Sequence, residues 1–129
     1  MKYFYATLLF LFVTGYSFSQ QVINSSLTLN GTTRNYILFI PGSYDPSTPA
    51  PLVFSFHGYS SNAALNMNYT GFTAISDTAG FILVHPDGTL DASSTPHWNV
   101  GGWTVGSTAD DVGFTEAMID EISASYNIN

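Results

Sequence analysis

The segment "LVFSFHGYSSN", Leu52 to Asn62, decides how the rest of the sequence is interpreted. Its first residues are apolar or small and favour extended backbone, which is typical of a buried strand in a parallel sheet. The apolar run stops at His57-Gly58, and polar residues follow. In open α/β sheets, ligands bind outside the carboxyl ends of the strands. The segment therefore predicts a strand that ends at a candidate site.

Strand and helix patterns alternate on both sides of this segment. Upstream, "VINSSLTLNGTTRNYILFIP" indicates two strands joined by a tight turn at Asn30-Gly31, the strongest short hairpin signal. Downstream, "TGFTAISDTAG" favours a short helix closed by Gly80, and "FILVHPDG" favours a second buried strand. Strands that alternate with helices imply right-handed βαβ crossovers and a mostly parallel sheet.

The last predicted element is a helix within "DDVGFTEAMIDEISASYNIN". Phe114, Met118 and Ile122 recur at i+4 and form one apolar face. Val112, Ile119 and Tyr126 are expected to extend that face, as Phe72, Ile75 and Ala79 are expected to form the inward face of the earlier helix. Asp110 and Asp111 are expected to cap the helix, because a helix N-terminus favours negative charge.

Composition excludes several classes of protein. The 129 residues are 45% hydrophobic, contain no cysteine, and carry a formal charge of −7 from nine acids against Lys2 and Arg34. A chain this acidic has no surface for a phosphate backbone or an anionic membrane, so neither nucleic acid nor membrane is an expected partner. Without cysteine there is no thiol nucleophile, disulfide or thiolate metal site.

The N-terminal residues predict export. Lys2 precedes the apolar run "YFYATLLFLFVTGYSFS", which is shorter than the about 20 residues that span a membrane and ends in small residues. We expect a signal peptide at residues 1–19 and one domain at residues 20–129. The expected location is secreted, either extracellular or periplasmic.

Four segments together resemble secreted esterases of the polyhydroxybutyrate depolymerase and feruloyl esterase group. They are "RNYILFIPGSYDPSTPAPLVFSFHGYSSN", "AISDTAGFILVHPDG", "WNVGG" and "DDVGFTEAMIDEISASYNIN", and they cover nearly all of residues 34–129. The resemblance implies the N-terminal part of an α/β-hydrolase fold. Its expected form is an antiparallel hairpin leading into a mostly parallel sheet flanked by helices, truncated before the nucleophile elbow.

The resemblance implies a role for the backbone around His57. In α/β-hydrolases the loop after the third strand donates N–H groups to the oxyanion hole. Gly58 allows close approach to a ligand, and the backbone N–H of Tyr59 is expected to point at the oxyanion together with Gly58. His57 is expected to orient the loop, not to transfer protons. The alternative is an ordinary turn with His57 as a hydrogen-bonded core residue.

The resemblance also implies ester hydrolysis by a Ser–His–Asp triad through an acyl-enzyme, with the serine in a G-x-S-x-G elbow. No such motif occurs in the sequence. The nucleophile, the acid and the histidine are all expected after Asn129, and this chain is expected to be inactive and poorly stable alone. The expected substrate is a polyester or a plant cell-wall ester, with no cofactor and no metal.

Alternatives remain open at this stage. Trp98 and Trp103 are candidate substrate contacts. A secreted, non-catalytic glycan-binding module would use the same two residues, and this is the alternative function. The alternative role for Trp98 is to pack its loop onto the sheet. A local dyad of Ser60 with His57 or His85, a metal site from the three histidines with Asp87, and a peptidase or dienelactone-type parent are further alternatives.

One departure from the family bears on its subfamily. Many relatives carry cysteine directly after the His-Gly pair and directly before the Trp-Asn pair, where this sequence has Tyr59 and His97. The joint replacement implies the loss of a covalent tie between the two loops. It leaves a backbone oxyanion role intact, but the acyl group, the alcohol and the oligomeric state stay undetermined.

Overall fold

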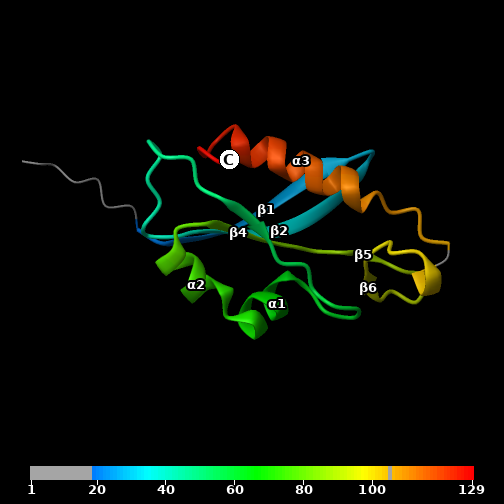
Figure 1. Cartoon of the computed structure of the whole chain (residues 1–129). Helices are drawn as coiled ribbons and strands as arrows, with labels where there is room; N and C mark the ends of the chain where they lie inside the picture. Colours follow the sequence, from blue (N-terminus) through cyan, green and yellow to red (C-terminus); the bar gives the residue numbers. More distant parts are fainter. Residues whose placement is uncertain (1–18, 105) are drawn as a thin grey trace, which may run out of the picture.

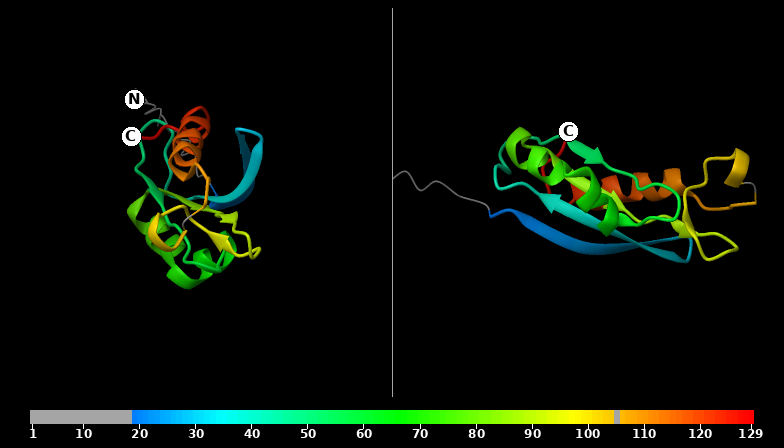
Figure 2. Two further views of the ribbon diagram at one scale, coloured as in Figure 1. Left: turned by 90° about the vertical axis from the view of Figure 1, so that its right-hand side faces the viewer. Right: turned by 90° about the horizontal axis from the view of Figure 1, so that it is seen from below.

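The computed structural model describes residues 19–104 and 106–129, without the side chain of Trp103. Three layers are visible: helix α3 (Asp111–Ser123) covers one face of a sheet, and helices α1 (Ala63–Thr70) and α2 (Phe72–Ala79) cover the other (Figures 1 and 2). Residues 1–18 of the expected signal peptide lie outside the described part of the chain.

The main sheet has the strand order β1-β2-β4-β3. Strands β1 (Gln21–Leu29) and β2 (Thr32–Ile40) form the expected antiparallel hairpin, and Asn30 and Gly31 take the positive φ angles, 51° and 80°, of its two-residue turn. Pro41 follows the last residue of β2, as its missing N–H requires.

The prediction of a mostly parallel sheet is wrong for the described residues. β2 pairs antiparallel with β4 (Ile82–Pro86), and only β3 (Leu52–Phe54) is parallel to β4. β3 is also shorter than its apolar run and lies at the edge of the sheet, not at its centre. The sheet is therefore mixed, because the hairpin adds two antiparallel pairs to a single βαβ unit.

Both faces of the sheet are buried, as the apolar runs predict. On the α3 side, the core is built from alternate residues of β2 and β4 under the expected apolar face of α3; its members are Tyr36, Leu38, Ile40, Ile82, Val84, Phe114, Met118 and Ile122. Ile37, Phe39 and Leu83 are equally buried, and by alternation they face α1 and α2. The continuous apolar pattern thus indicates two covered faces.

Two helix faces differ from expectation. In α2 the buried residue is Ser76, whereas Phe72 and Ile75 are 38% and 51% exposed. Ser76 donates its hydroxyl to the carbonyl of Phe81, so a small polar residue makes the close contact with the sheet and turns its neighbours outward. In α3, Val112 and Ile119 are exposed, while Tyr126 beyond the helix packs on the core.

The sequence did not predict four further elements, which are helix α1, the two strands of a short hairpin and a 3₁₀ turn. Helix α1 begins after Asn62, whose side chain accepts the N–H of Leu65 at 2.9 Å. The segment between β4 and α3 contains a short hairpin, β5 (Thr89–Leu90) and β6 (Pro96–His97), and the 3₁₀ turn η1 (Gly102–Thr104). The hairpin extends beyond the carboxyl end of β4 (Figure 1).

Candidate functional site

The loop after β3 is held at the carboxyl end of the one parallel strand pair. Ser55 donates its N–H to Val84 at 2.8 Å and so continues the pairing past β3. Ser60 takes a positive φ of 63°, donates to the carbonyl of Pro96 at 3.0 Å, and precedes the N-cap of α1. The loop is therefore anchored to β4, to β6 and to α1. It lies at the carboxyl ends of the strands, where α/β proteins place their sites.

His57 is a clamp within this loop. Its Nε2 accepts the backbone N–H of Gly88 at 2.9 Å, so the proton is on Nδ1, which donates to the carbonyl of Gly58 at 2.7 Å. The ring is buried, with 3% of its surface exposed. Both nitrogens are engaged by backbone groups, so His57 has no nitrogen left to act as a base for Ser60.

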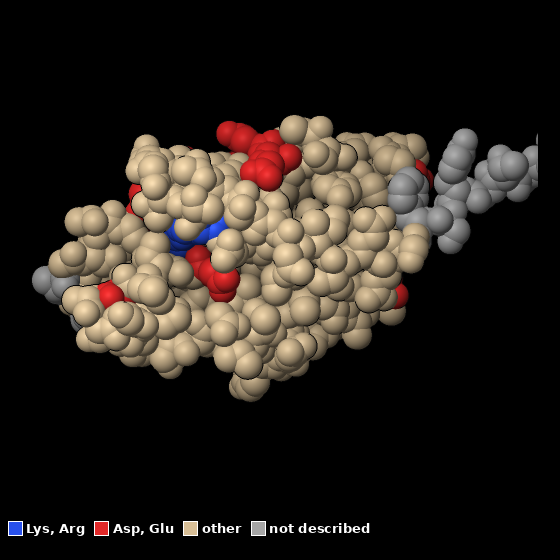
Figure 3. Space-filling view, turned by 180° about the vertical axis from the view of Figure 1, so that it is seen from behind, with Lys and Arg blue, Asp and Glu red and all other residues tan. Residues whose placement is uncertain are grey.

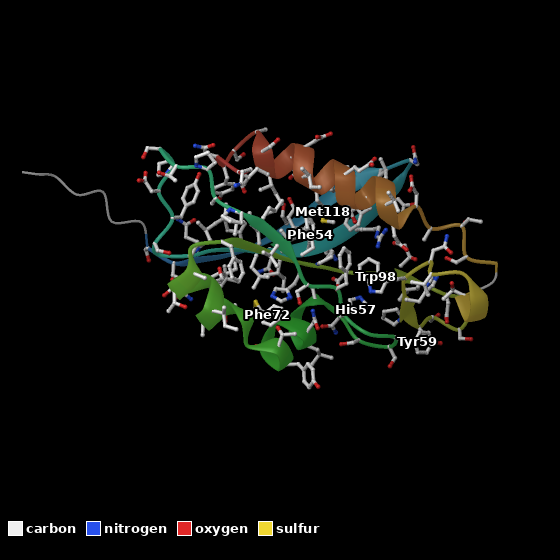
Figure 4. All side chains as sticks on the ribbon, viewed as in Figure 1. Phe54, His57, Tyr59, Phe72, Trp98 and Met118 are labelled. Atoms are coloured by element: carbon white, nitrogen blue, oxygen red, sulfur yellow. The ribbon has the colours of Figure 1, made fainter. Side chains whose placement is uncertain are left out.

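Trp98, which follows β6 in the chain, contacts the same loop. Its indole N–H donates to the carbonyl of His57 at 2.8 Å, and its ring makes an edge contact with Phe56 at 5.0 Å between centroids. Figure 4 shows His57 and Trp98 beside each other, with Tyr59 farther toward the β5–β6 hairpin. Trp98 thus packs its loop onto the candidate site, whereas the side chain of Trp103 lies outside the described residues.

Gly58 and Tyr59 lie at the exposed tip of the loop. An added Cβ on Gly58 would meet no described heavy atom within 4 Å, so the backbone here is open to close approach. The hydroxyl of Tyr59 donates to Asp91 at 3.0 Å, which ties the tip to the β5–β6 hairpin. The tip therefore lies at the carboxyl end of the β3–β4 pair, where the sequence predicts the oxyanion donors.

The turn Pro86-Asp87-Gly88 joins the parts of the site. Asp87 accepts the N–H of Ala63 at 2.7 Å through its carboxylate, and so binds the first turn of α1. Gly88 packs so closely on the carbonyl of His97 that a Cβ would overlap it. The sequence predicted this turn only as the end of a strand, because the residues that Asp87 and Gly88 contact lie in distant segments.

Arg34 is the buried cation of the site. Its guanidinium forms an ion pair with Asp111 at 2.7 Å and donates to the carbonyl of Asp87 at 3.0 Å. It also lies over the ring of Phe114, 4.0 Å from the centroid. Asp110 caps α3 as expected, with its carboxylate accepting the N–H of Gly113 at 2.8 Å. Asp111 instead neutralises Arg34, which ties β2 to α3.

The other two histidines, His85 and His97, are also buried, and each has its own set of neighbours. His85 is fully buried on β4; its Nδ1 lies 3.4 Å from the amide nitrogen of Asn66, and its Nε2 has no partner among the described residues. Burial lowers the pKa of His85 and keeps it neutral. His97 donates from Nδ1 to the carbonyl of Thr89, and its Nε2 accepts the hydroxyl of Ser107 at 2.7 Å.

Within residues 19–104 and 106–129, no three His, Asp or Glu side chains come together in a group that could hold a metal ion. The same described residues contain no helix that is both long enough and apolar enough to cross a bilayer.

Comparison with known proteins supports the α/β assignment. No protein-family model matches the chain. A bifunctional acetylxylan esterase/xylanase of Neocallimastix patriciarum is 25% identical over 109 residues, which are 84% of this chain and 15% of that protein. The crystal structure of S-formylglutathione hydrolase from Staphylococcus aureus aligns with a TM-score of 0.59 and 15% identity.

The structural match covers 86% of this chain and 43% of the hydrolase. The chain therefore spans less than half of the solved structure and about a seventh of the esterase/xylanase that it resembles. At this identity the structural likeness establishes the fold alone. The chain has an α/β fold in common with that hydrolase and weak sequence homology to the acetylxylan esterase/xylanase.

Proposed function

We propose that this chain is the N-terminal portion of a secreted carboxylic ester hydrolase that uses a serine acyl-enzyme mechanism. The observation that carries the proposal is the clamped loop of residues 55–60 at the carboxyl end of a parallel strand pair, in a chain that is similar to an acetylxylan esterase. Such a loop supplies oxyanion donors in α/β-hydrolases. The substrate is proposed to be a polyester or a plant cell-wall ester.

The proposed chemistry divides between this chain and residues encoded downstream. A serine oxygen attacks the ester carbonyl, a histidine takes its proton and passes it to the leaving alcohol, and water then releases the acid from the acyl-serine. The backbone N–H groups of Gly58 and Tyr59 would stabilise the oxyanion of both tetrahedral intermediates. His57 would hold that loop through its bonds to Gly58 and Gly88.

The C-terminal residues support a continuing sheet. Ala50 forms a parallel bridge with Ile128, donating to the carbonyl of Asn127 at 2.9 Å and accepting the N–H of Asn129 at 3.1 Å. Residues 127–129 therefore pair in parallel with Ala50, two residues before β3 begins, in the direction of a further parallel strand. We propose that this strand leads to the G-x-S-x-G elbow.

The first test compares two lengths of chain. We expect the 129-residue chain to hydrolyse p-nitrophenyl acetate no faster than buffer. A longer chain that includes the downstream G-x-S-x-G motif should hydrolyse it, and serine-to-alanine replacement in the motif should abolish turnover. Activity of the 129-residue chain that a serine-directed inhibitor removes would contradict the proposed division.

The second test addresses the oxyanion donors. In the longer chain, Tyr59→Pro removes one backbone N–H and should lower kcat by about 10²–10³-fold. Tyr59→Ala is the matched control, because it removes the same side chain and keeps the N–H. Equal loss of activity in both variants would assign the effect to the tyrosine ring and not to its amide.

The glycan-binding alternative receives less support from the same residues. Trp98 is half-buried against Phe56 and His57. Its ring therefore packs the loop after β3, and less of it is exposed for contact with a glycan. Ester hydrolysis is the function that the loop geometry and the sequence homology favour together.

A further inference from the structure

Strand β1 forms the other edge of the main sheet, and its outer side takes no part in the proposed chemistry. Within residues 19–104 and 106–129 it pairs with β2 alone, and it runs along the outer margin of the molecule (Figure 2). The pairing continues through all nine residues of the strand without a bulge. β1 is therefore a regular edge strand that is longer than a typical strand of about 5–6 residues.

Alternation identifies the backbone groups of β1 that face away from the sheet. The carbonyl of Asn35 on β2 accepts the N–H of Asp87, which follows β4, so Asn35 bonds toward β4. Its neighbour Tyr36 therefore bonds toward β1, where its partner is Ser25. Ser25 and every second residue from it use their N–H and C=O groups on β2. The intervening residues direct theirs outward and have exposed side chains; they are Val22, Asn24, Ser26 and Thr28.

The edge lacks the features by which proteins prevent strand pairing. Charged side chains, prolines and bulges commonly protect edge strands. None of the nine residues "QVINSSLTL" is charged or a proline, although the whole chain carries a formal charge of −7. Seen from the side of β1, acidic side chains form separate small groups with uncharged surface between them (Figure 3). A second copy of this acidic chain would therefore meet little repulsion at the strand itself.

We infer that β1 pairs antiparallel with β1 of a second copy, about a two-fold axis at Ser25, and joins two four-stranded sheets into one. In this register Val22 lies opposite Thr28 of the second copy. Asn24 lies opposite Ser26 of the second copy. The outward groups of both strands then form about eight main-chain hydrogen bonds. A typical protein interface carries about ten, so the strand pair supplies nearly a full set.

The side chains favour this register over its neighbours. Ile23 and Leu27 are half-buried and pack against the core on the α3 face of the sheet. With the axis at Ser25, Ile23 lies opposite Leu27 of the second copy, at a non-hydrogen-bonded pair where side chains approach closely. A shift of the register in either direction shortens the overlap and places Ser25 opposite an apolar side chain, Ile23 or Leu27.

Cysteine cross-linking tests the position of the axis, because residues 1–129 contain no cysteine. The protein used is the longer chain with the downstream motif, in which the proposed next strand covers the edge of β3. Ser25→Cys places two thiols opposite each other with Cα atoms about 4.5 Å apart, a distance that a disulfide spans. Mild oxidation should link most of this variant into dimers that a reductant separates.

Ser26→Cys is the matched control for the cross-link. Its Cα atoms in the two copies would lie about 8–9 Å apart, which is too far for a disulfide, so this variant should stay unlinked. The unsubstituted longer chain, oxidised in parallel, measures any cross-linking through cysteines beyond Asn129.

Sedimentation velocity measures the dimer itself. The longer chain should sediment as a dimer at micromolar concentration. Ser26→Pro removes an outward N–H, leaves the bonds of β1 to β2 intact, and should raise the dimer dissociation constant at least about ten-fold. Ser26→Ala removes the same hydroxyl but keeps the N–H, and it should leave the dimer unchanged. Circular dichroism checks the fold of Ser26→Pro, and the cross-linking pair decides if that variant does not fold.

Three results would overturn the inference. A longer chain that stays monomeric up to millimolar concentration, with no cross-link in Ser25→Cys, would mean that β1 stays unpaired. Equal cross-linking of Ser25→Cys and Ser26→Cys would indicate random collision and not a fixed register. A dimer that persists in folded Ser26→Pro would be held by another surface. None of these measurements uses ester hydrolysis, so they are independent of the proposed function.

Discussion

Single residues hold the candidate site through backbone contacts. His57 shows this most clearly, since its two ring nitrogens bind the carbonyl of Gly58 and the N–H of Gly88. A neutral histidine can donate from one nitrogen and accept at the other, so this pair of partners selects one tautomer. The ring therefore links the loop after β3 to the turn after β4 without carrying a charge.

Gly88 has no room for a side chain. A Cβ there would overlap the backbone carbonyl of His97 and approach the His57 ring at 3.3 Å. We expect Gly88→Ala to lower the free energy of unfolding by about 1–3 kcal/mol, the usual range for overpacking. Urea unfolding measures the change. Gly58→Ala is the control, because no described atom lies within 4 Å of its Cβ position, and an equal loss in the two variants would contradict this account.

His85 makes stability depend on pH. Burial lowers its pKa in the folded state, so the folded protein resists the proton that the unfolded chain accepts. The stability that neutral His85 contributes is complete above its unfolded pKa of about 6.5 and is lost as pH falls from there through the folded pKa.

Below about pH 6.5, this group should cost up to about 1.4 kcal/mol of unfolding free energy per pH unit, until the folded pKa is reached. Urea unfolding between pH 7.5 and 5 checks the slope. His85→Leu should reduce the slope over that range, and an unchanged slope would assign the effect to other groups.

At the scale of elements, a buried ion pair joins β2 to α3. Arg34 and Asp111 have side-chain exposures of 6% and 15%, and Arg34 also lies over Phe114 on α3. Burying two charges is costly, and their mutual attraction mainly offsets that cost. The pair therefore specifies how α3 docks on the sheet more than it adds net stability.

Replacing one partner of the ion pair should lower the free energy of unfolding much more than replacing both partners together. Arg34→Met or Asp111→Leu alone leaves a buried charge and should lower the free energy of unfolding by about 3–5 kcal/mol. The double variant should recover most of that loss, which a double-mutant cycle by chemical denaturation measures. Asp110→Ala, which removes only the cap of the same helix, should cost about 1 kcal/mol. Additive losses in the double variant would argue against direct pairing.

At the scale of the whole molecule, the edge of the sheet at β3 is largely unpaired within residues 19–104 and 106–129. β3 pairs with β4 on one side only, and residues 127–129 begin to pair on its other side at Ala50. Ser55 directs its N–H toward β4, so by alternation Leu52 and Phe54 direct theirs away from it. An unpaired apolar edge of this kind favours association between chains.

Hydrogen exchange should reveal this edge. In the 129-residue chain we expect the amides of Val53 and Ser55 to be protected and those of Leu52 and Phe54 to exchange rapidly. In a longer chain that supplies the proposed next strand, all four should become protected. Strong protection of Leu52 and Phe54 in the dilute 129-residue chain would mean that another segment already covers the edge.

Local patterns in the sequence determined the hairpin at Asn30-Gly31, the two-sided burial of the strands, and the inward face of α3 at Phe114, Met118 and Ile122. Each depends on turn chemistry or on periodicity within a few residues, which a sequence displays directly. The edge position of β3, the pairing of Arg34 with Asp111 and the His57 clamp on Gly88 required the tertiary structure. These features join segments that are distant in the chain, and neither composition nor spacing encodes which distant partners meet.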